Sequence, residues 1–169
     1  PAAAPAAPAR VHDFAQKLQQ ATLWPYVVDY VRWQRAVRAA AAAGKPVPEQ
    51  PALAPLSINL DLTTACNYAC DHCIDWDILN SKVRHEDDEL RASVQRMAER
   101  GLRSVILIGG GEPTLYPGFP AFVQFLKGLG LAVAVVSNGS RGDRLLAAAP
   151  FFTEGDWIRL SLDSGSNEV

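Results

Sequence analysis

Residues 64–73 read TACNYACDHC, and this stretch contains every cysteine of the chain. Cys66, Cys70 and Cys73 have the spacing C-x3-C-x2-C and directly follow a strand-like run, residues 57–63. Thiolates on one short loop can converge on a metal centre, and most iron–sulfur clusters take four thiolate ligands. Because the chain has no fourth cysteine, one iron would keep an open position, as metal sites do when a substrate or cofactor binds the metal.

The cysteine spacing resembles the signature of the radical S-adenosylmethionine (radical SAM) superfamily, with Cys66, Cys70 and Cys73 on its three positions. The resemblance implies a [4Fe–4S] cluster on these side chains, with the unique iron chelated by the amino and carboxylate groups of S-adenosylmethionine (SAM). Family members often carry an aromatic residue just before the third cysteine, near the adenine. His72, a polar ring, occupies that position, so the resemblance makes it a candidate cofactor-binding residue.

Composition argues against several classes of protein. Hydrophobic residues make up 49% of the chain, as is ordinary for a globular domain. The net charge of −2 gives no basic footprint for nucleic acid or an anionic membrane surface. No apolar run reaches the roughly 18 residues of a membrane span, and residues 1–8 lack the pattern of a signal peptide. Clustered cysteines suit a metal site in a reducing cytoplasm better than disulfides.

The order of segments predicts one main domain with an N-terminal extension. The boundaries are a disordered Ala/Pro tail at 1–10, a helical region at 11–44, a Pro-rich linker at 45–56 and the main domain at 57–169. A helix is expected from about residue 25 to 43, and Gly44 is expected to end it. The simplest interpretation of this amphipathic region is a cap that buries an apolar stripe on the main domain. The alternative is a helix that docks a partner or a substrate.

Strands alternate with helices throughout the main domain. Strands are expected at 57–63, 104–108, 131–136 and 157–163, and helices at 86–100, 119–128 and 141–149. This alternation predicts an α/β fold with a parallel sheet built of right-handed βαβ units. The chain lacks an initiator Met and ends at Val169, soon after the fourth strand. We therefore expect a piece of a longer product, which would not be a competent enzyme alone.

Apolar and polar residues alternate along the first and fourth strands. One face of each is apolar, and the other carries polar residues such as Asn59 and Asp61 in the first strand, and Arg159 and Ser161 in the fourth. A parallel strand covered on both faces is apolar on both, so a polar face indicates a ligand-filled space. This pattern suits the partial parallel (β/α)6 barrel of the radical SAM family, of which the chain supplies about three and a half units.

A second stretch that carries chemistry reads IGGGEPT, residues 108–114. Its glycines allow close approach of the backbone to a ligand, and a tight strand–helix turn would also explain them. Thr114 stands where a dinucleotide fingerprint needs its third glycine. Glu112 and the preceding glycines resemble the family's Gly-Gly-Glu motif, which implies that Gly110, Gly111 and Glu112 bind the amino group of SAM. Because loops after parallel strands open at one end, this loop and the cysteine loop should be neighbours.

Two further strand ends carry polar residues. Ser137 and Asn138 follow the third strand and form either a turn, because Asn-Gly is a standard turn pair, or a SAM contact. Ser161 and Asp163 end the fourth strand, where family members often place a polar residue against the SAM ribose or carboxylate. No residue is assigned a catalytic role.

The resemblance covers residues 57–169 and implies an oxygen-sensitive radical SAM enzyme. In that family a one-electron donor such as flavodoxin or ferredoxin reduces the cluster, and a 5′-deoxyadenosyl radical then abstracts hydrogen from the substrate. Such cofactors perform the difficult chemistry while the protein binds and orients. The sequence does not identify the substrate; the resemblance implies a small molecule or a peptide, because the motifs resemble members that modify peptides or that build cofactors and natural products.

Two other functions remain open at this point. The first is a non-catalytic zinc module held by the three cysteines with His72 or His85, although structural zinc favours paired C-x2-C elements. The second is a scaffold that keeps the fold without activity. Iron–sulfur colour would separate the enzyme from the zinc module, and turnover of SAM would separate it from the scaffold.

Overall fold

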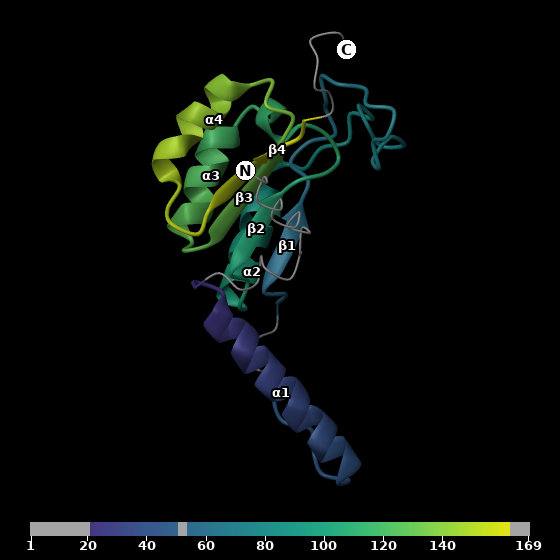
Figure 1. The fold of residues 1–169 in the computed structure, drawn as a ribbon, viewed down its shortest axis with the longest axis vertical. Coiled ribbons are helices and arrows are strands. Elements are labelled where there is room, and N and C mark those ends of the chain that lie inside the picture. Colours follow the sequence, from purple (N-terminus) through teal and green to yellow (C-terminus); the bar gives the residue numbers. More distant parts are fainter. Residues whose placement is uncertain (1–20, 51–53, 163–169) are drawn as a thin grey trace, which may run out of the picture.

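The computed structural model describes residues 21–50 and 54–162. Its centre is one parallel sheet in the order β1-β2-β3-β4 (Figure 1). The strands are β1 (Ser57–Leu60), β2 (Ser104–Leu107), β3 (Ala132–Ser137) and β4 (Trp157–Leu160). The connecting helices are α2 (Asp87–Glu99), α3 (Phe119–Gly128) and α4 (Gly142–Ala148), with short 3-10 turns η2 (Pro113–Leu115) and η3 (Ala149–Phe151). The predicted α/β fold with a parallel sheet is confirmed.

The helices lie where local sequence favours them. α3 has the predicted bounds and carries a proline in its first turn, where the missing N–H costs little. α2 has three acidic residues in its first turn and Arg96 in its last turn, an arrangement that complements the helix dipole.

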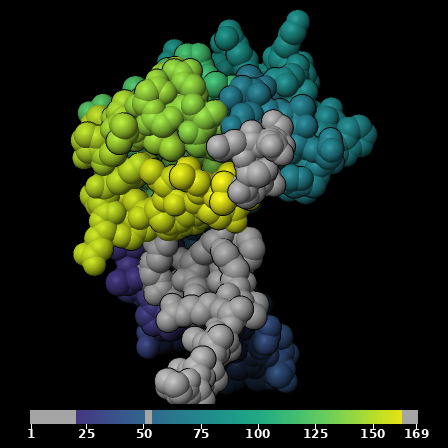
Figure 2. Space-filling model, turned by 45° about the horizontal axis from the view of Figure 1, so that its top comes forward, coloured from purple at the N-terminus to yellow at the C-terminus, as the bar shows by residue number. Residues whose placement is uncertain are grey.

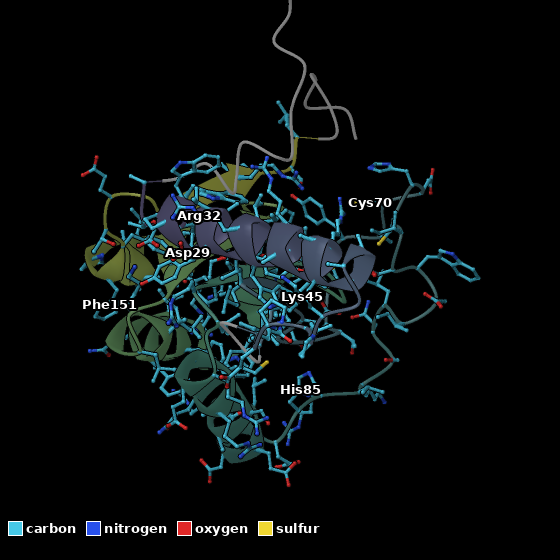
Figure 3. The ribbon with its side chains drawn as sticks, turned by 90° about the horizontal axis from the view of Figure 1, so that it is seen from below. Asp29, Arg32, Lys45, Cys70, His85 and Phe151 are labelled. Atoms are coloured by element: carbon cyan, nitrogen blue, oxygen red, sulfur yellow. The ribbon has the colours of Figure 1, made fainter. Side chains whose placement is uncertain are left out.

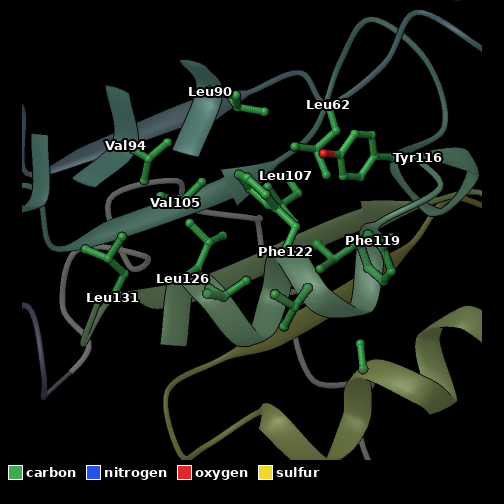
Figure 4. Close-up of a cluster of buried hydrophobic side chains, with 14 of the residues drawn as sticks. Leu62, Leu90, Val94, Val105, Leu107, Tyr116, Phe119, Phe122, Leu126 and Leu131 are labelled. Atoms are coloured by element: carbon green, nitrogen blue, oxygen red, sulfur yellow. The ribbon is translucent and has the colours of Figure 1, made fainter. Parts of the chain in front are cut away.

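Within the described residues, the main cluster of buried hydrophobic side chains lies on one face of the sheet. Val105 and Leu107 of β2 are fully buried and pack with α2, α3 and α4 side chains (Figure 4). Val133 and Val135 continue this layer on β3, in register with Val105 and Leu107. Because side chains alternate between faces along a strand, residues at the intervening positions point to the opposite face. The helices therefore cover the sheet from outside, as expected for part of a barrel.

β1 ends earlier than predicted, at Leu60 rather than at residue 63. Leu62 still points into the core, with 2% exposure, but it lies beyond the ladder. The neighbouring strand accounts for this, because Gly109 and Gly110 follow it with φ of 91° and 67°. Backbone in the left-handed region cannot continue a strand, so β1 loses its partner there. β4 likewise ends at Leu160, and Asp163 lies outside the described residues.

The apolar side of β4 is exposed in the part of the chain that the structure describes. Ile158 is 39%, Leu160 59% and Leu162 86% exposed, and the strand lies at the surface in Figure 2. Ile158 aligns with the buried Val135 of β3, so these side chains continue the core-facing layer without a helix over them.

The helix α1 (Trp24–Ala42) does not bury its stripe on the sheet as the cap interpretation expects, since none of its residues is buried. Figure 1 shows it extending from the amino ends of the strands, opposite the cysteine loop. One contact with the main domain lies near its start, where the guanidinium of Arg103, the residue before β2, lies 4.7 Å from the Tyr26 ring centroid. The earlier predicted helical turns, from residue 11, lie outside the described residues. The division into four segments stays a prediction, and no helix in the described part could span a membrane.

The Asp156 side chain, 1% exposed, ties the turn before β4 to the core. It lies 2.7 Å from Lys127 Nζ and accepts hydrogen bonds from the backbone N–H groups of Val133 and Thr153. Burial raises the pKa of Asp156, but Lys127 and these donors outweigh it and hold the pKa below its usual 3.8. Its stabilising effect should therefore be complete above about pH 4 and be lost as the pH falls through the folded-state pKa.

We expect Asp156→Asn to lower the free energy of unfolding at pH 7 by about 3 kcal/mol, because it leaves the Lys127 charge unpaired. The difference from the unchanged chain should shrink below about pH 4. Urea unfolding between pH 7 and pH 3 measures both, with the exposed neighbour Glu154 changed to Gln as control. A constant difference across this range would contradict the assignment.

Candidate active site

One pocket of about 470 Å³ lies over the sheet face opposite the helices and at the carboxyl ends of the strands. Ligand pockets commonly have this size and this position in α/β folds. The structure brings nearly all of the candidate site residues into its lining: Cys66, Cys70, His72, Cys73, Gly110, Gly111, Glu112, Ser137, Asn138 and Ser161. Asp163 is the exception, because it lies outside the described residues.

The cysteine loop is held at its base by Asn80. The Asn80 side chain accepts a hydrogen bond of 2.9 Å from Cys66 N–H, and its own N–H donates to Thr64 O at 2.7 Å. Asn80 has φ of 57°, a conformation that Asn adopts more readily than most residues. The N–H of Tyr68 points to Cys66 Sγ at 3.4 Å, a contact that would stabilise a thiolate. Figure 3 shows Cys70 in this loop and His85 in the segment that leads from the loop back to α2.

The glycine loop touches the cysteine loop backbone to backbone. Glu112 N–H donates to Ala65 O at 2.9 Å. A Cβ atom on Gly111 would lie 2.3 Å from the same oxygen, closer than any side chain can come. The predicted neighbourhood of the two loops is therefore present, and close loop packing alone is a sufficient reason for Gly111.

The Glu112 carboxylate is 3% exposed and joins the glycine loop to the end of β3. Its Oε1 accepts hydrogen bonds from Thr114 N–H, the Thr114 hydroxyl and the Ser137 hydroxyl, while Oε2 accepts one from Asn138 N–H at 2.8 Å. We expected this carboxylate to face SAM; the structure adds that it already has protein partners. Each carboxylate oxygen offers about two acceptor positions, and Oε2 uses one of them for Asn138 N–H, so Oε2 can still take a further donor.

A third contact joins the cysteine loop to the end of β3. The Asn67 side-chain oxygen accepts hydrogen bonds from Asn138 Nδ2 at 3.1 Å and from the Ser140 hydroxyl at 3.3 Å. Sequence reasoning did not identify Asn67 or Asn80 as part of the site. Two asparagines within or just after a cysteine-rich loop are a usable signal, because an amide can bridge backbone and side-chain groups.

The donor set suits a cluster better than a single metal ion. Cys66, Cys70 and Cys73 form no disulfide with one another, are partly buried and lie around one pocket. In the described residues, no three His, Cys, Asp or Glu side chains gather as one ion requires. Tetrahedral zinc with bonds of about 2.3 Å holds its sulfurs only about 3.8 Å apart, whereas a cubane receives each thiolate on a different iron. Three thiolates around one pocket fit a cluster, and the zinc alternative is not favoured.

Comparison with known proteins identifies the family. The model of the radical SAM superfamily matches residues 60–169, more than half of the chain. The chain belongs to the radical SAM superfamily.

Curated relatives within this superfamily match the same region. The chain is 38% identical over 112 residues to an S-adenosylmethionine-dependent nucleotide dehydratase of a Thermoplasmatales archaeon (strain ISO4-H5), covering 64% of this chain and 38% of that protein. It is 32% identical over 120 residues to the mycofactocin maturase MftC of Mycobacterium ulcerans, covering 69% of this chain and 31% of the relative. The chain thus spans well under half the length of these relatives.

Solved radical SAM structures have the same fold. Streptococcus suis SuiB bound to S-adenosylmethionine superimposes with a TM-score of 0.52 at 20% identity, over 64% of this chain and 24% of SuiB. BtrN in complex with AdoMet and 2-DOIA gives a TM-score of 0.51 at 15% identity, over 66% of this chain and 47% of BtrN. At these identities the likeness establishes the fold alone.

Proposed function

We propose that this chain carries the catalytic core of a radical SAM enzyme, with a [4Fe–4S] cluster on Cys66, Cys70 and Cys73 and SAM beside it. The observation that carries the proposal is the meeting of the cysteine loop and the glycine loop around one pocket on the polar face of the sheet. When bound, the cluster and SAM together supply a 5′-deoxyadenosyl radical that abstracts hydrogen.

The chain's own residues have binding and orienting roles in this proposal. Gly110 and Gly111 present backbone groups to the SAM amino group, and the free position of Glu112 Oε2 accepts a hydrogen bond from it. Asn138 and Ser161, which line the same pocket, contact the rest of SAM. The remaining assignments, His72 near the adenine, Ser137 and Asp163, stay predictions of the same kind.

The proposed partners are a one-electron donor, such as flavodoxin or ferredoxin, and a small molecule or a peptide as substrate. The relatives support both kinds of substrate, because one is named a nucleotide dehydratase and another a mycofactocin maturase. Peptide modification and the biosynthesis of a cofactor or natural product are the reaction classes proposed. The expected setting is the cytoplasm, in keeping with an oxygen-sensitive cluster.

Anaerobic reconstitution of the chain with iron and sulfide tests the proposal. We expect a brown protein that binds SAM and, on reduction with dithionite, releases 5′-deoxyadenosine without substrate, an uncoupled reaction that does not require the chain to be competent for substrate turnover. The chromatographic yield of 5′-deoxyadenosine is compared with that of the same preparation without reductant. A colourless protein, or a brown protein that neither binds nor cleaves SAM, would count against a radical SAM function for this chain.

A further inference from the structure

Four side chains form a row across the sheet face that lines the pocket. Val136 of β3 pairs with Arg159 of β4. The register Leu60–Leu107–Val135, continued by one residue, adds Ile108 and Asp61 to the same row. All four of these side chains line the pocket. With neighbouring strands about 4.8 Å apart, the row is about 14 Å long, with an acid at one end, a base at the other and two apolar side chains between them.

The two ends of the row are open to a ligand. Among the described residues, none forms a hydrogen bond or ion pair with the Asp61 carboxylate or the Arg159 guanidinium, and Arg159 is exposed. A Cβ atom on Gly109 would lie 2.5 Å from Asp61 Oδ1, so the carboxylate rests directly against the glycine loop. Burial, followed by the nearby Asp75, raises the pKa of Asp61, and His85 lowers it in part. The end of the row at β1 therefore carries acidic side chains, and the end at β4 carries a basic side chain.

The Arg159 end of the row lies deeper in the pocket than Ser161, which is proposed to contact SAM. Arg159 precedes Ser161 by two residues on the same face of β4, which places it about 6.6 Å nearer the amino ends of the strands. The cysteine and glycine loops lie beyond the carboxyl ends. This separation assigns the Arg159 end of the row to a molecule other than SAM, while the Asp61 end lies against the glycine loop, where the two molecules would meet.

We propose that Arg159 and Asp61 select the substrate of this enzyme. The substrate carries an anionic group, a phosphate or a carboxylate, that pairs with Arg159, and a hydrogen-bond donor that pairs with Asp61. Its apolar part lies between these groups, over Ile108 and Val136. The guanidinium fork matches either anion in two parallel hydrogen bonds. The assignment rests on the proposed function, because the pocket is then shared with SAM.

Binding to the reconstituted, SAM-loaded chain under anaerobic conditions tests this proposal. The probes are GTP, which carries phosphates, and a blocked Gly-Glu-Gly peptide, which carries a carboxylate; calorimetry gives both dissociation constants. We expect one probe to bind, and Arg159→Met to weaken its binding by about 10- to 100-fold, as for a lost charge-assisted hydrogen bond. The probe that binds identifies the anion.

Matched variants keep the interpretation specific. Arg35→Met removes the same charge from the exposed surface of α1 and should leave probe binding unchanged. Asp61→Asn should weaken binding of the selected probe by about tenfold and leave binding of pyrophosphate, which lacks the second group, unchanged. Circular dichroism checks that the variants fold.

Three outcomes would overturn the proposal. In the first, neither probe binds at millimolar concentration. In the second, Arg35→Met and Arg159→Met lose probe affinity equally. In the third, Arg159→Met loses affinity for SAM itself. The last result would make Arg159 a cofactor contact. Failure of the proposed function is recognised separately, because it appears as a missing cluster or missing SAM cleavage in the unchanged chain.

Discussion

Changing any one of Cys66, Cys70 and Cys73 to alanine is expected to remove nearly all of the iron and sulfide that the chain takes up on reconstitution. A cubane with three protein thiolates already lacks one of the usual four ligands. Losing a second leaves two irons without a protein ligand, in a pocket that is open to solvent. We expect iron per chain to fall from about four to well below one, and the visible absorption to disappear with it.

Colorimetric iron and sulfide assays after anaerobic reconstitution measure this effect. The matched control is Ser81→Ala, in the same long loop but outside the pocket lining, which should retain its full cluster content. If one cysteine variant keeps normal iron and sulfide, that cysteine is not a ligand.

Changing Glu112 should produce two effects that different substitutions separate. Glu112→Ala leaves the Ser137 hydroxyl, Asn138 N–H and Thr114 N–H without their acceptor in a buried place. Each stranded donor costs about 1–3 kcal/mol, so we expect the free energy of unfolding to fall by at least about 3 kcal/mol. Glu112→Gln keeps the shape and one acceptor oxygen, and should lose much less stability.

The Gln variant isolates the role in SAM binding. Without the negative charge, the SAM ammonium loses a charge-assisted hydrogen bond, and its affinity should fall by about 10- to 100-fold while the cluster stays intact. Urea unfolding gives the stabilities, equilibrium dialysis with SAM gives the affinities, and Glu154→Gln serves as the exposed control. Normal SAM affinity in Glu112→Gln would make Glu112 a purely structural link between the two loops.

Local pattern was sufficient to predict most of the fold. Phe119–Gly128 is a helix over the predicted range because its apolar side chains repeat at helical spacing and a proline begins it. The sheet order followed from alternation of strands and helices. β1 is shorter than its alternating pattern indicates, because the glycines after β2 end the ladder. α1 forms the expected helix, yet none of its residues is buried. The periodicity of apolar residues indicates which side of a helix is apolar, but it does not indicate which other element packs against that side.

The composition of the pocket was also predictable, but its internal contacts were not. Parallel topology brings the loops after successive strands to one edge, so three cysteines and the Gly110–Glu112 run meet there. The hydrogen bonds of Glu112 to Ser137 and Asn138 join residues 25 and 26 positions apart. The local sequence does not predict such pairs, because they depend on how two loops pack against each other in the folded chain.

The attachments of the cysteine loop have a consequence for how a cofactor is inserted. Cys66 N–H is tied to Asn80, Ala65 O to Glu112, and Asn67 to Asn138. The conformational entropy lost in ordering this loop is therefore lost when the polypeptide folds, before any iron arrives. In zinc fingers, by contrast, the metal itself drives folding. Here the apoprotein should present a preformed receptor, and its circular dichroism spectrum should change little when the cluster is inserted.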